Sequence, residues 1–275
     1  MSKIKPFYSI FSNGIPYAKI GSGKKVMLVL QGGLVNEIPK GSAFTMFAKP
    51  FYMFLQEYTI YFVTRKSGLA ENYSTLDMAN DYANLITEEF DGNVAVIVGI
   101  SFGGYIAQYV AIEHPEMCNY FVIVMASYKC SDKGAKFVLE YSRYMNEGKS
   151  GKAFSTISNV FIPNKIIRFF LKPFFYIFGS FMKPTSESFK QDLAVEVKAE
   201  ANHDTKDQLK EITKPTLVIC GDKDYFVPFN HLKEMEQLIP NATVKIYEGE
   251  GHNIVNNNRF TRDIAIFIKK QEVVL

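Results

Sequence analysis

Cysteine is scarce in this chain of 275 residues, where it occurs only as Cys118, Cys130 and Cys220. An odd number of cysteines without a C-x-x-C spacing argues against a disulfide framework and against a structural zinc site. Cys118 and Cys220 lie beside or within apolar segments, so we expect both to be small buried hydrophobic residues. The scarcity favours a reducing compartment. We therefore predict a cytoplasmic protein without a metal or an organic cofactor.

Charge of one sign is also in short supply. The 31 basic and 28 acidic residues leave a net charge of +3, which is too small to indicate a nucleic-acid partner. No cluster of Lys and Arg alternates with aromatic residues, as a nucleic-acid-binding surface would require. Residues 1–14 contain no continuous apolar segment, and we therefore expect no signal peptide.

An uninterrupted apolar run of membrane-spanning length is absent as well. The most hydrophobic segment is Ile166–Met182, and Arg168, Lys172 and Pro173 interrupt it. A transmembrane helix needs roughly 20 consecutive apolar residues. This segment is therefore not predicted to span a membrane.

Short apolar runs alternate with segments of helical periodicity through most of the chain. The predicted strands are Val26–Leu30, Tyr58–Val63, Val94–Val98, Tyr120–Met125, Thr216–Cys220 and Thr243–Tyr247, and the predicted helices are Leu76–Phe90, Gly103–Glu113, Phe229–Leu238 and Arg259–Lys270. Strands without polar alternation are typical of a sheet that is buried on both faces. The sequence therefore predicts an α/β fold with a mostly parallel central sheet flanked by helices.

Residues 128–207 interrupt this alternation, and a structureless insert of that length is uncommon in a compact domain. We predict a helical cap here, inserted between the two parts of a core that comprises residues 1–127 and 208–275. The favoured interpretation of Ile166–Met182 is a lid whose aromatic face lines a substrate pocket. Contact of the cap with a membrane surface is a less favoured alternative, and ordinary core packing is a third.

The segment Val94–Ile112 carries the most specific motif of the chain. A β-branched run ends in Gly99-Ile100-Ser101-Phe102-Gly103, and a helical pattern follows. A strand, a G-x-S-x-G turn and a helix are typical of a nucleophile elbow, which exposes the serine hydroxyl on a strained turn. Glycines two residues before and after Ser101 fit this turn because side chains there would collide with it. The alternative is an ordinary tight turn with a solvated serine.

A serine nucleophile requires a base and an acid. Among the four histidines, His252 lies in a glycine-punctuated loop after the last predicted strand, where it can reach the carboxyl edge of the sheet. His114, His203 and His231 lie at a helix end, in a polar linker and at a helix start. Asp224, in the loop after Thr216–Cys220, is the preferred acid. Asp222 is the reserve, because it follows Gly221 directly and can instead stabilise the turn.

The order Ser101, Asp224, His252, each on a loop after a strand, resembles the α/β-hydrolase superfamily. Residues 214–228 resemble the acid-bearing strand and loop of that family, in which the acid is the aspartate four residues before the proline. Residues 249–252 resemble its histidine loop. The resemblance implies the α/β-hydrolase fold, with a helical cap at the position of the insert.

Two segments depart from the family pattern, although the resemblance extends from Val26 to Lys270. The His-Gly pair after the early strand is replaced by Gln31-Gly32-Gly33, and the glycine-rich stretch after the next strand is reduced to Thr64–Gly68. The resemblance still implies an oxyanion hole, because its donors are backbone N–H groups. We expect these donors to be Phe102 and Gly33, with Leu34 as a neighbouring candidate.

The resemblance implies a serine hydrolase that cleaves a carboxylic ester, or a related acyl bond, of a small apolar substrate through an acyl-enzyme. Three other reactions of the same side chains stay open: thioester cleavage, acyl transfer and hydrolysis of a carbon–carbon bond. A non-catalytic ligand-binding protein on this fold is a further alternative. The natural substrate and the oligomeric state are not predicted by the sequence.

Overall fold

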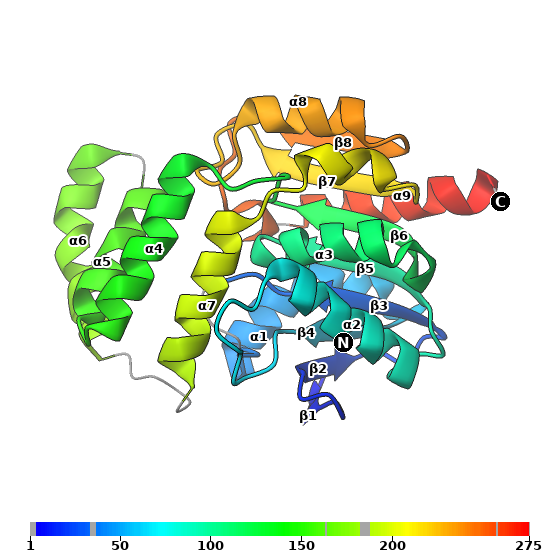
Figure 1. Cartoon of the computed structure of the whole chain (residues 1–275), viewed down its shortest axis with the longest axis horizontal. Helices are drawn as coiled ribbons and strands as arrows, with labels where there is room; N and C mark the ends of the chain where they lie inside the picture. The colour runs from blue at the N-terminus through cyan, green and yellow to red at the C-terminus, as the bar shows by residue number, and fades with distance from the viewer. Residues whose placement is uncertain (1–3, 34–36, 163, 182–187, 257, 275) are drawn as a thin grey trace.

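The computed structural model describes residues 4–33, 37–162, 164–181, 188–256 and 258–274, which form an eight-stranded sheet with helices around it (Figure 1). The strand order across the sheet is β1-β2-β4-β3-β5-β6-β7-β8. β2 is antiparallel to β1 and β4, whereas all neighbours from β4 to β8 are parallel. The strands are β1 (Phe7–Ile10), β2 (Pro16–Ile20), β3 (Lys25–Leu30), β4 (Tyr58–Val63), β5 (Val94–Ile100), β6 (Cys118–Val124), β7 (Thr216–Gly221) and β8 (Ala242–Tyr247).

Helices cover both faces of the sheet, as the unbroken apolar strands predicted. One hydrophobic cluster joins the sheet to α2, α3 and α8, and a second joins its other face to α1, η1 and α9. These elements are α1 (Gly41–Ala48), η1 (Lys49–Phe54), α2 (Thr75–Glu89), α3 (Phe102–Glu113), α8 (Phe229–Leu238) and α9 (Arg259–Val274). Cys118 and Cys220 are buried in the strands, which confirms their prediction as core residues. The mostly parallel α/β sheet predicted from the sequence is therefore confirmed.

A helical insert follows β6 and precedes β7. Its helices are α4 (Asp132–Asn146), α5 (Ser150–Phe161), α6 (Lys165–Ser180) and α7 (Phe189–Asn202), and the short η3 (Lys206–Glu211) leads back to the sheet. They lie beyond the edge where the parallel strands end, with α4 and α7 nearer the sheet and α6 outermost (Figure 1). α4 and α7 pack against each other, and both contribute side chains to the core cluster that contains α2 and α3.

The segment predicted to be an aromatic lid forms the helix α6, which lies on the outer side of the insert (Figure 1). α6 packs on α5, where Gly151 and Gly179 permit a close approach and Phe154 meets Phe178 with ring centroids 6.0 Å apart. Most of the remaining apolar side chains of α6 are exposed to solvent. Met182, the last residue of the predicted segment, lies outside the described residues.

Gly103 allows α3 to lie directly against β3, because a Cβ atom at this position would overlap the backbone carbonyl of Leu30. We expect Gly103→Ala to lower the free energy of unfolding by about 3 kcal/mol through overpacking. Gly148→Ala is the control, because a Cβ atom at Gly148 would meet no other atom within 4 Å. Its φ of +72° leaves backbone strain as the expected effect of the substitution. The control should lose about 1 kcal/mol from backbone strain alone. Urea unfolding measures both variants, and equal losses would contradict the steric argument.

Candidate active site

Ser101 is held on a strained turn between β5 and α3. Its φ of +53° and ψ of −120° are uncommon for a residue with a side chain. The Ser101 amide donates a 2.8 Å hydrogen bond to the carbonyl of Val124 on β6, and the Ser101 carbonyl accepts one of 2.7 Å from Gly104. A Cβ atom at Gly99 would lie 2.7 Å from the Cβ of Ala107, so glycine is required before the turn. The strand, turn and helix are therefore arranged as the motif predicts.

The structure brings Ser101, His252 and Asp224 together from three loops at the carboxyl edge of the sheet. Ser101 Oγ lies 2.9 Å from His252 Nε2. On the other side of the imidazole, His252 Nδ1 lies 2.8 Å from Asp224 Oδ2 and 3.0 Å from Oδ1. Ser101 and His252 are 151 positions apart in the chain, and His252 and Asp224 are 28 apart. The three side chains form a continuous hydrogen-bonded series that we call the triad.

Asp224 is the best-supported member of the triad, with a fully buried side chain. Its Oδ1 accepts hydrogen bonds from the amides of Phe226 at 2.8 Å and Val227 at 3.2 Å. Hydrogen bonds from backbone N–H groups stabilise a buried carboxylate as an anion and fix its orientation. The Phe226 ring also packs on the His252 imidazole, with centroids 4.6 Å apart. The carboxylate and the ring together hold the imidazole in position.

Asp222, the reserve acid, lies in a different environment. Its Oδ1 accepts a 2.7 Å hydrogen bond from the amide of Gly249, three residues before His252. Asp222 thus joins the loop after β7 to the loop that carries the histidine. The structure pairs Asp224, and not Asp222, with the imidazole.

The loop after β3 contacts the serine turn. A Cβ atom at Gly32 would lie 2.6 Å from the Cβ of Ser101, so the backbone of this loop lies directly against the elbow. Gly33 follows with a φ of +93°, a conformation that favours glycine. Phe102 is the first residue of α3, where a backbone N–H has no partner within the helix. Leu34, the neighbouring candidate donor, lies outside the described residues.

Arg65 is a component of the site that the sequence analysis missed. The Arg65 side chain is buried, with 2% of the residue exposed. Its guanidinium donates hydrogen bonds to the carbonyls of Gln31 at 3.1 Å and Gly33 at 3.3 Å. Its guanidinium also pairs with Glu196 on α7 through two hydrogen bonds of 2.8 and 2.7 Å. The Phe102 ring lies 5.0 Å from its charged carbon. A single buried cation therefore joins the loop after β3, the start of α3 and the helical insert.

The charge of Arg65 depends on Glu196. Burial by itself lowers the pKa of Arg65, but the attraction and hydrogen bonds of Glu196 outweigh this effect and raise it. In the sequence, the available signal was an arginine that directly follows an apolar strand and Thr64. The pattern could not identify its partner, which lies 131 positions away.

We expect Arg65→Leu to lower the free energy of unfolding by about 3–5 kcal/mol, because it leaves the Glu196 carboxylate buried without its counter-ion. The double variant Arg65→Leu with Glu196→Leu removes both charges and should lose clearly less. Urea unfolding at pH 7 compares the two. A double variant that is less stable than the single variant would show that the ion pair does not account for the effect.

Glu200 lies one helical turn beyond Glu196 on α7, and it is also buried. Burial raises the pKa of Glu200 to about 7, with Arg65 lowering it and Glu196 raising it further. A glutamate with a raised pKa keeps its proton in the folded protein at a pH where the unfolded chain has released it. The stability that this carboxyl contributes is therefore complete below about pH 4.5 and declines as the pH rises to about 7.

We expect Glu200→Gln to remove this decline, because the amide is neutral at every pH. The variant should exceed the native protein in stability by about 2 kcal/mol at pH 8 and should match it near pH 4.5. Urea unfolding at the two pH values measures the difference. Glu113→Gln, at an exposed position on α3, is the control and should show no gain. Equal gains at both pH values would contradict the assignment to protonation.

The other three histidines have structural surroundings away from Ser101. His203 is buried beside Tyr105, with Nδ1 2.9 Å from Thr75 Oγ1, and burial lowers the pKa of His203 to about 3. His231 stacks on Tyr128, and His114 hydrogen-bonds with Asn80. None of these three imidazoles is placed to act on Ser101.

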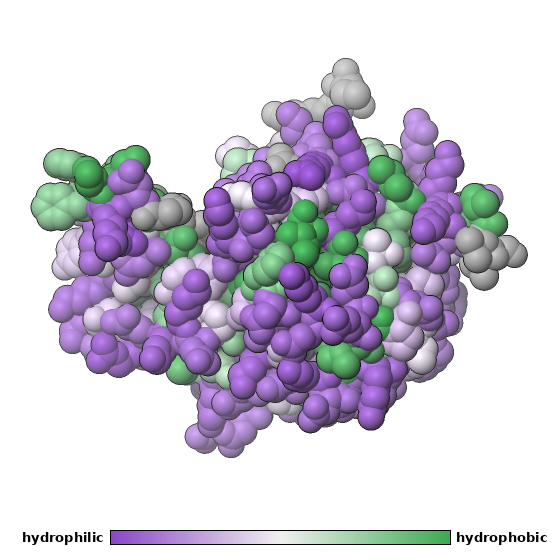
Figure 2. All heavy atoms as spheres, turned by 90° about the horizontal axis from the view of Figure 1, so that it is seen from above, coloured by the Kyte–Doolittle hydropathy of each residue, from purple (hydrophilic) through white to green (hydrophobic). Residues whose placement is uncertain are grey.

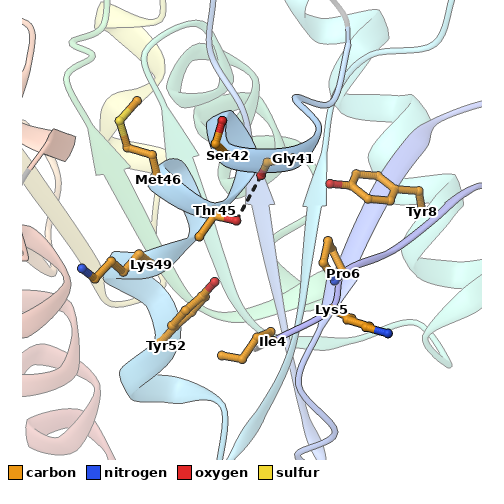
Figure 3. Close-up of a pocket in the computed structure, with 10 residues that line it drawn as sticks. All are labelled: Ile4, Lys5, Pro6, Tyr8, Gly41, Ser42, Thr45, Met46, Lys49 and Tyr52. Atoms are coloured by element: carbon orange, nitrogen blue, oxygen red, sulfur yellow. Dashed lines mark hydrogen bonds between the residues drawn. The ribbon is translucent and has the colours of Figure 1, made fainter. Parts of the chain in front are cut away.

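A large groove lies elsewhere on the molecule, between the N-terminal segment and α1. It has a volume of about 1190 Å³, and Figure 3 shows Ile4, Pro6 and Tyr8 on one side of it and Met46, Lys49 and Tyr52 on the other. No member of the triad lines this groove. The triad and this groove are therefore separate features of the surface.

Comparison with known proteins agrees with this architecture. A family model of the α/β hydrolase fold matches residues 63–257. The putative carbamate hydrolase RutD of Serratia proteamaculans is 22% identical over 212 residues, which cover 75% of this chain and 77% of that protein. The non-heme chloroperoxidase CPO-A1 of Kitasatospora aureofaciens is 39% identical over 72 residues, and this shorter match spans 24% of this chain and 26% of the relative.

Solved structures show the same fold at lower sequence identity. The enol-lactonase from Burkholderia xenovorans superposes with a TM-score of 0.72 at 15% identity, over 96% of this chain and 100% of that chain. An esterase from Exiguobacterium antarcticum gives 0.70 at 18% identity, with the same coverage. The chain belongs to the α/β-hydrolase fold family, which confirms the family resemblance of its sequence. The family and the relatives whose names denote hydrolases support the conclusion that this protein is a hydrolase.

Proposed function

We propose that this protein is a serine hydrolase that cleaves a carboxylic ester, or a related acyl bond, through the triad. The observation that carries the proposal is the hydrogen-bonded series from Ser101 Oγ through the His252 imidazole to the buried Asp224 carboxylate. A serine hydroxyl next to an imidazole that a carboxylate orients is the arrangement that activates serine as a nucleophile.

In the proposed mechanism, Ser101 Oγ attacks the acyl carbonyl while His252 Nε2 accepts the hydroxyl proton. The imidazolium then gives this proton to the leaving group, and the acyl group stays on Ser101 as an ester. Asp224 stabilises the imidazolium and keeps Nδ1 protonated, so that Nε2 is free to accept. A water molecule releases the acyl group in the second half of the reaction, with His252 again as the base.

The oxyanion of each tetrahedral intermediate would be stabilised by the amides of Phe102 and Gly33. The first N–H groups of α3 point toward its N-terminal end, where the helix dipole favours negative charge. The loop of Gly33 lies against Ser101, and Arg65 donates a hydrogen bond to the carbonyl of Gly33. One such donor contributes on the order of 3 kcal/mol to the stability of the transition state.

An apolar acyl substrate fits the surroundings of the triad. Phe226 packs against the imidazole with the two rings tilted by 59°, and Phe137 of α4 packs on Phe226 with ring centroids 5.7 Å apart. Through Phe226, the helical insert is therefore connected to the imidazole by aromatic contacts. Relatives named as a carbamate hydrolase, an enol-lactonase and an esterase all have names that denote the hydrolysis of acyl bonds.

We expect a fluorescent fluorophosphonate to label the native protein and not Ser101→Ala, because only an activated serine reacts with it.

Asp224→Asn should lower kcat for a short p-nitrophenyl ester by about three to four orders of magnitude, since it disturbs the imidazole tautomer. Asp222→Asn is a matched control at the neighbouring aspartate. Its side-chain oxygen can still accept from Gly249, and kcat should stay within about tenfold of the native value.

Circular dichroism and the Tm of each variant show whether the fold is retained. Absence of labelling in well-folded native protein would overturn the proposal and favour a non-catalytic ligand-binding protein. A panel of esters, thioesters and diketones then distinguishes ester hydrolysis from thioester cleavage and from hydrolysis of a carbon–carbon bond. An added alcohol that captures the acyl group in preference to water would indicate acyl transfer.

A further inference from the structure

α6 presents an unusually apolar surface at the end of the molecule farthest from β8 and α9. Five large apolar side chains spaced three or four residues apart lie on one face, and they are 58–80% exposed: Ile166, Phe170, Phe174, Ile177 and Phe181. Figure 2 shows the hydrophobic patch on the projecting left end of the molecule. We call this set the α6 face. Contiguous exposed apolar patches on a protein mark sites of interaction with another apolar surface.

The charges of α6 are of one sign. Lys165, Arg168 and Lys172 follow the same three- and four-residue spacing on the opposite side of the helix, and the α6 sequence contains no acidic residue. A helix with an apolar face and a basic face is amphipathic in the way that favours the boundary of an anionic bilayer. Long basic side chains on the polar side of such a helix are flexible enough to extend their charges toward the lipid headgroups.

The length of α6 decides how it can meet a bilayer. Its 16 residues rise about 24 Å, which is shorter than the roughly 30 Å of a hydrocarbon core. Within the described residues, no helix is long and apolar enough to cross a membrane. Contact must therefore occur with the helix lying in the plane of the interface.

A second copy of the chain is a poorer occupant of the same face. A twofold dimer joins identical patches, so a second α6 would bring no acidic residue that could pair with the basic side chains of the first. The inner helices α4 and α7, which contact the core, are not involved in the α6 face. The protein can therefore bind a surface through α6 without a change in the geometry of the triad.

We propose that the α6 face docks the protein on the surface of an anionic lipid bilayer, with α6 lying in the interface. This inference concerns where the protein acts and is independent of the proposed hydrolysis. The five side chains of the face enter the boundary between headgroups and acyl chains, and the basic side attracts anionic headgroups. The helical insert then positions the carboxyl edge of the sheet near the membrane surface.

The first test is sedimentation of the full chain with vesicles of phosphatidylcholine containing phosphatidylglycerol. We expect the native protein to sediment with them, and Ile166→Ser with Ile177→Ser to lower the partition coefficient about tenfold or more. The matched control is Ile10→Ser with Ile266→Ser, which changes two isoleucines of similar exposure, 64% and 65%, on β1 and α9. Native protein that stays in the supernatant, or equal losses in the two double variants, would overturn the proposal.

The second test concerns charge. Lys165→Gln with Lys172→Gln should weaken binding to the phosphatidylglycerol vesicles, whereas Lys269→Gln with Lys270→Gln, at exposed positions on α9, should not. Binding should also fall between about 0.1 M and 1 M salt, where the screening length shortens from roughly 10 to 3 Å. Binding that is unaffected by these charges and by salt would contradict the anionic surface.

The third test locates the contact. The chain contains no tryptophan, so Phe174→Trp places a single indole on the α6 face. Its emission should shift to shorter wavelength when vesicles are added, while a Phe7→Trp control on β1 should not shift. An unchanged α6 signal in sedimenting protein would assign the contact to another surface. A dimer in light scattering that Ile166→Ser with Ile177→Ser dissociates would identify a second copy as the occupant and overturn the lipid proposal.

Discussion

At the carboxyl end of β5, three backbone segments approach one another so closely that no side chain fits between them. Gly103 lies against the carbonyl of Leu30, Gly32 against Ser101, and Gly99 against the first turns of α3. This close packing forces Ser101 into its strained conformation and brings the loop after β3 next to its hydroxyl. The position of the nucleophile therefore depends on glycine at positions 32, 99 and 103, where a side chain would collide with the neighbouring backbone. The surrounding sheet is rigid enough to maintain the strained conformation of Ser101.

Two buried charge systems organise the groups around this turn. Asp224 is held by backbone amides and orients His252, so the acid side of the site is built into the loop after β7. Arg65 and Glu196 form the other system, which links the loop of Gly33 to the helical insert. Buried charges require partners because desolvation destabilises an isolated ion. The consequence is that the insert and the core cannot separate at α7 without exposing or isolating a charge.

The helical insert has two parts with different environments. α4 and α7 pack on the core, and they contribute Phe137 against Phe226 and Glu196 beside Arg65. α5 and α6 form an outer pair, in which α6 is supported by α5 and keeps a broad apolar surface. The sequence predicted a helical insert at this place and favoured a lid whose aromatic face lines a substrate pocket. Amphipathic spacing reveals that a face is apolar, although not which neighbour covers it.

The sequence by itself determined the strands from β3 to β8, the α/β class and the identities of Ser101, Asp224 and His252 as candidates, whereas β1, β2 and α1 were not predicted. These features depend on patterns within a few residues, such as an apolar run, a G-x-S-x-G turn or a loop after a strand. Tertiary structure decided that Asp224 meets the imidazole while Asp222 supports the loop of Gly249. It also decided that Arg65 pairs with a residue 131 positions away and that α6 remains uncovered. Such contacts depend on how whole helices pack against the sheet, which no local pattern of residues encodes.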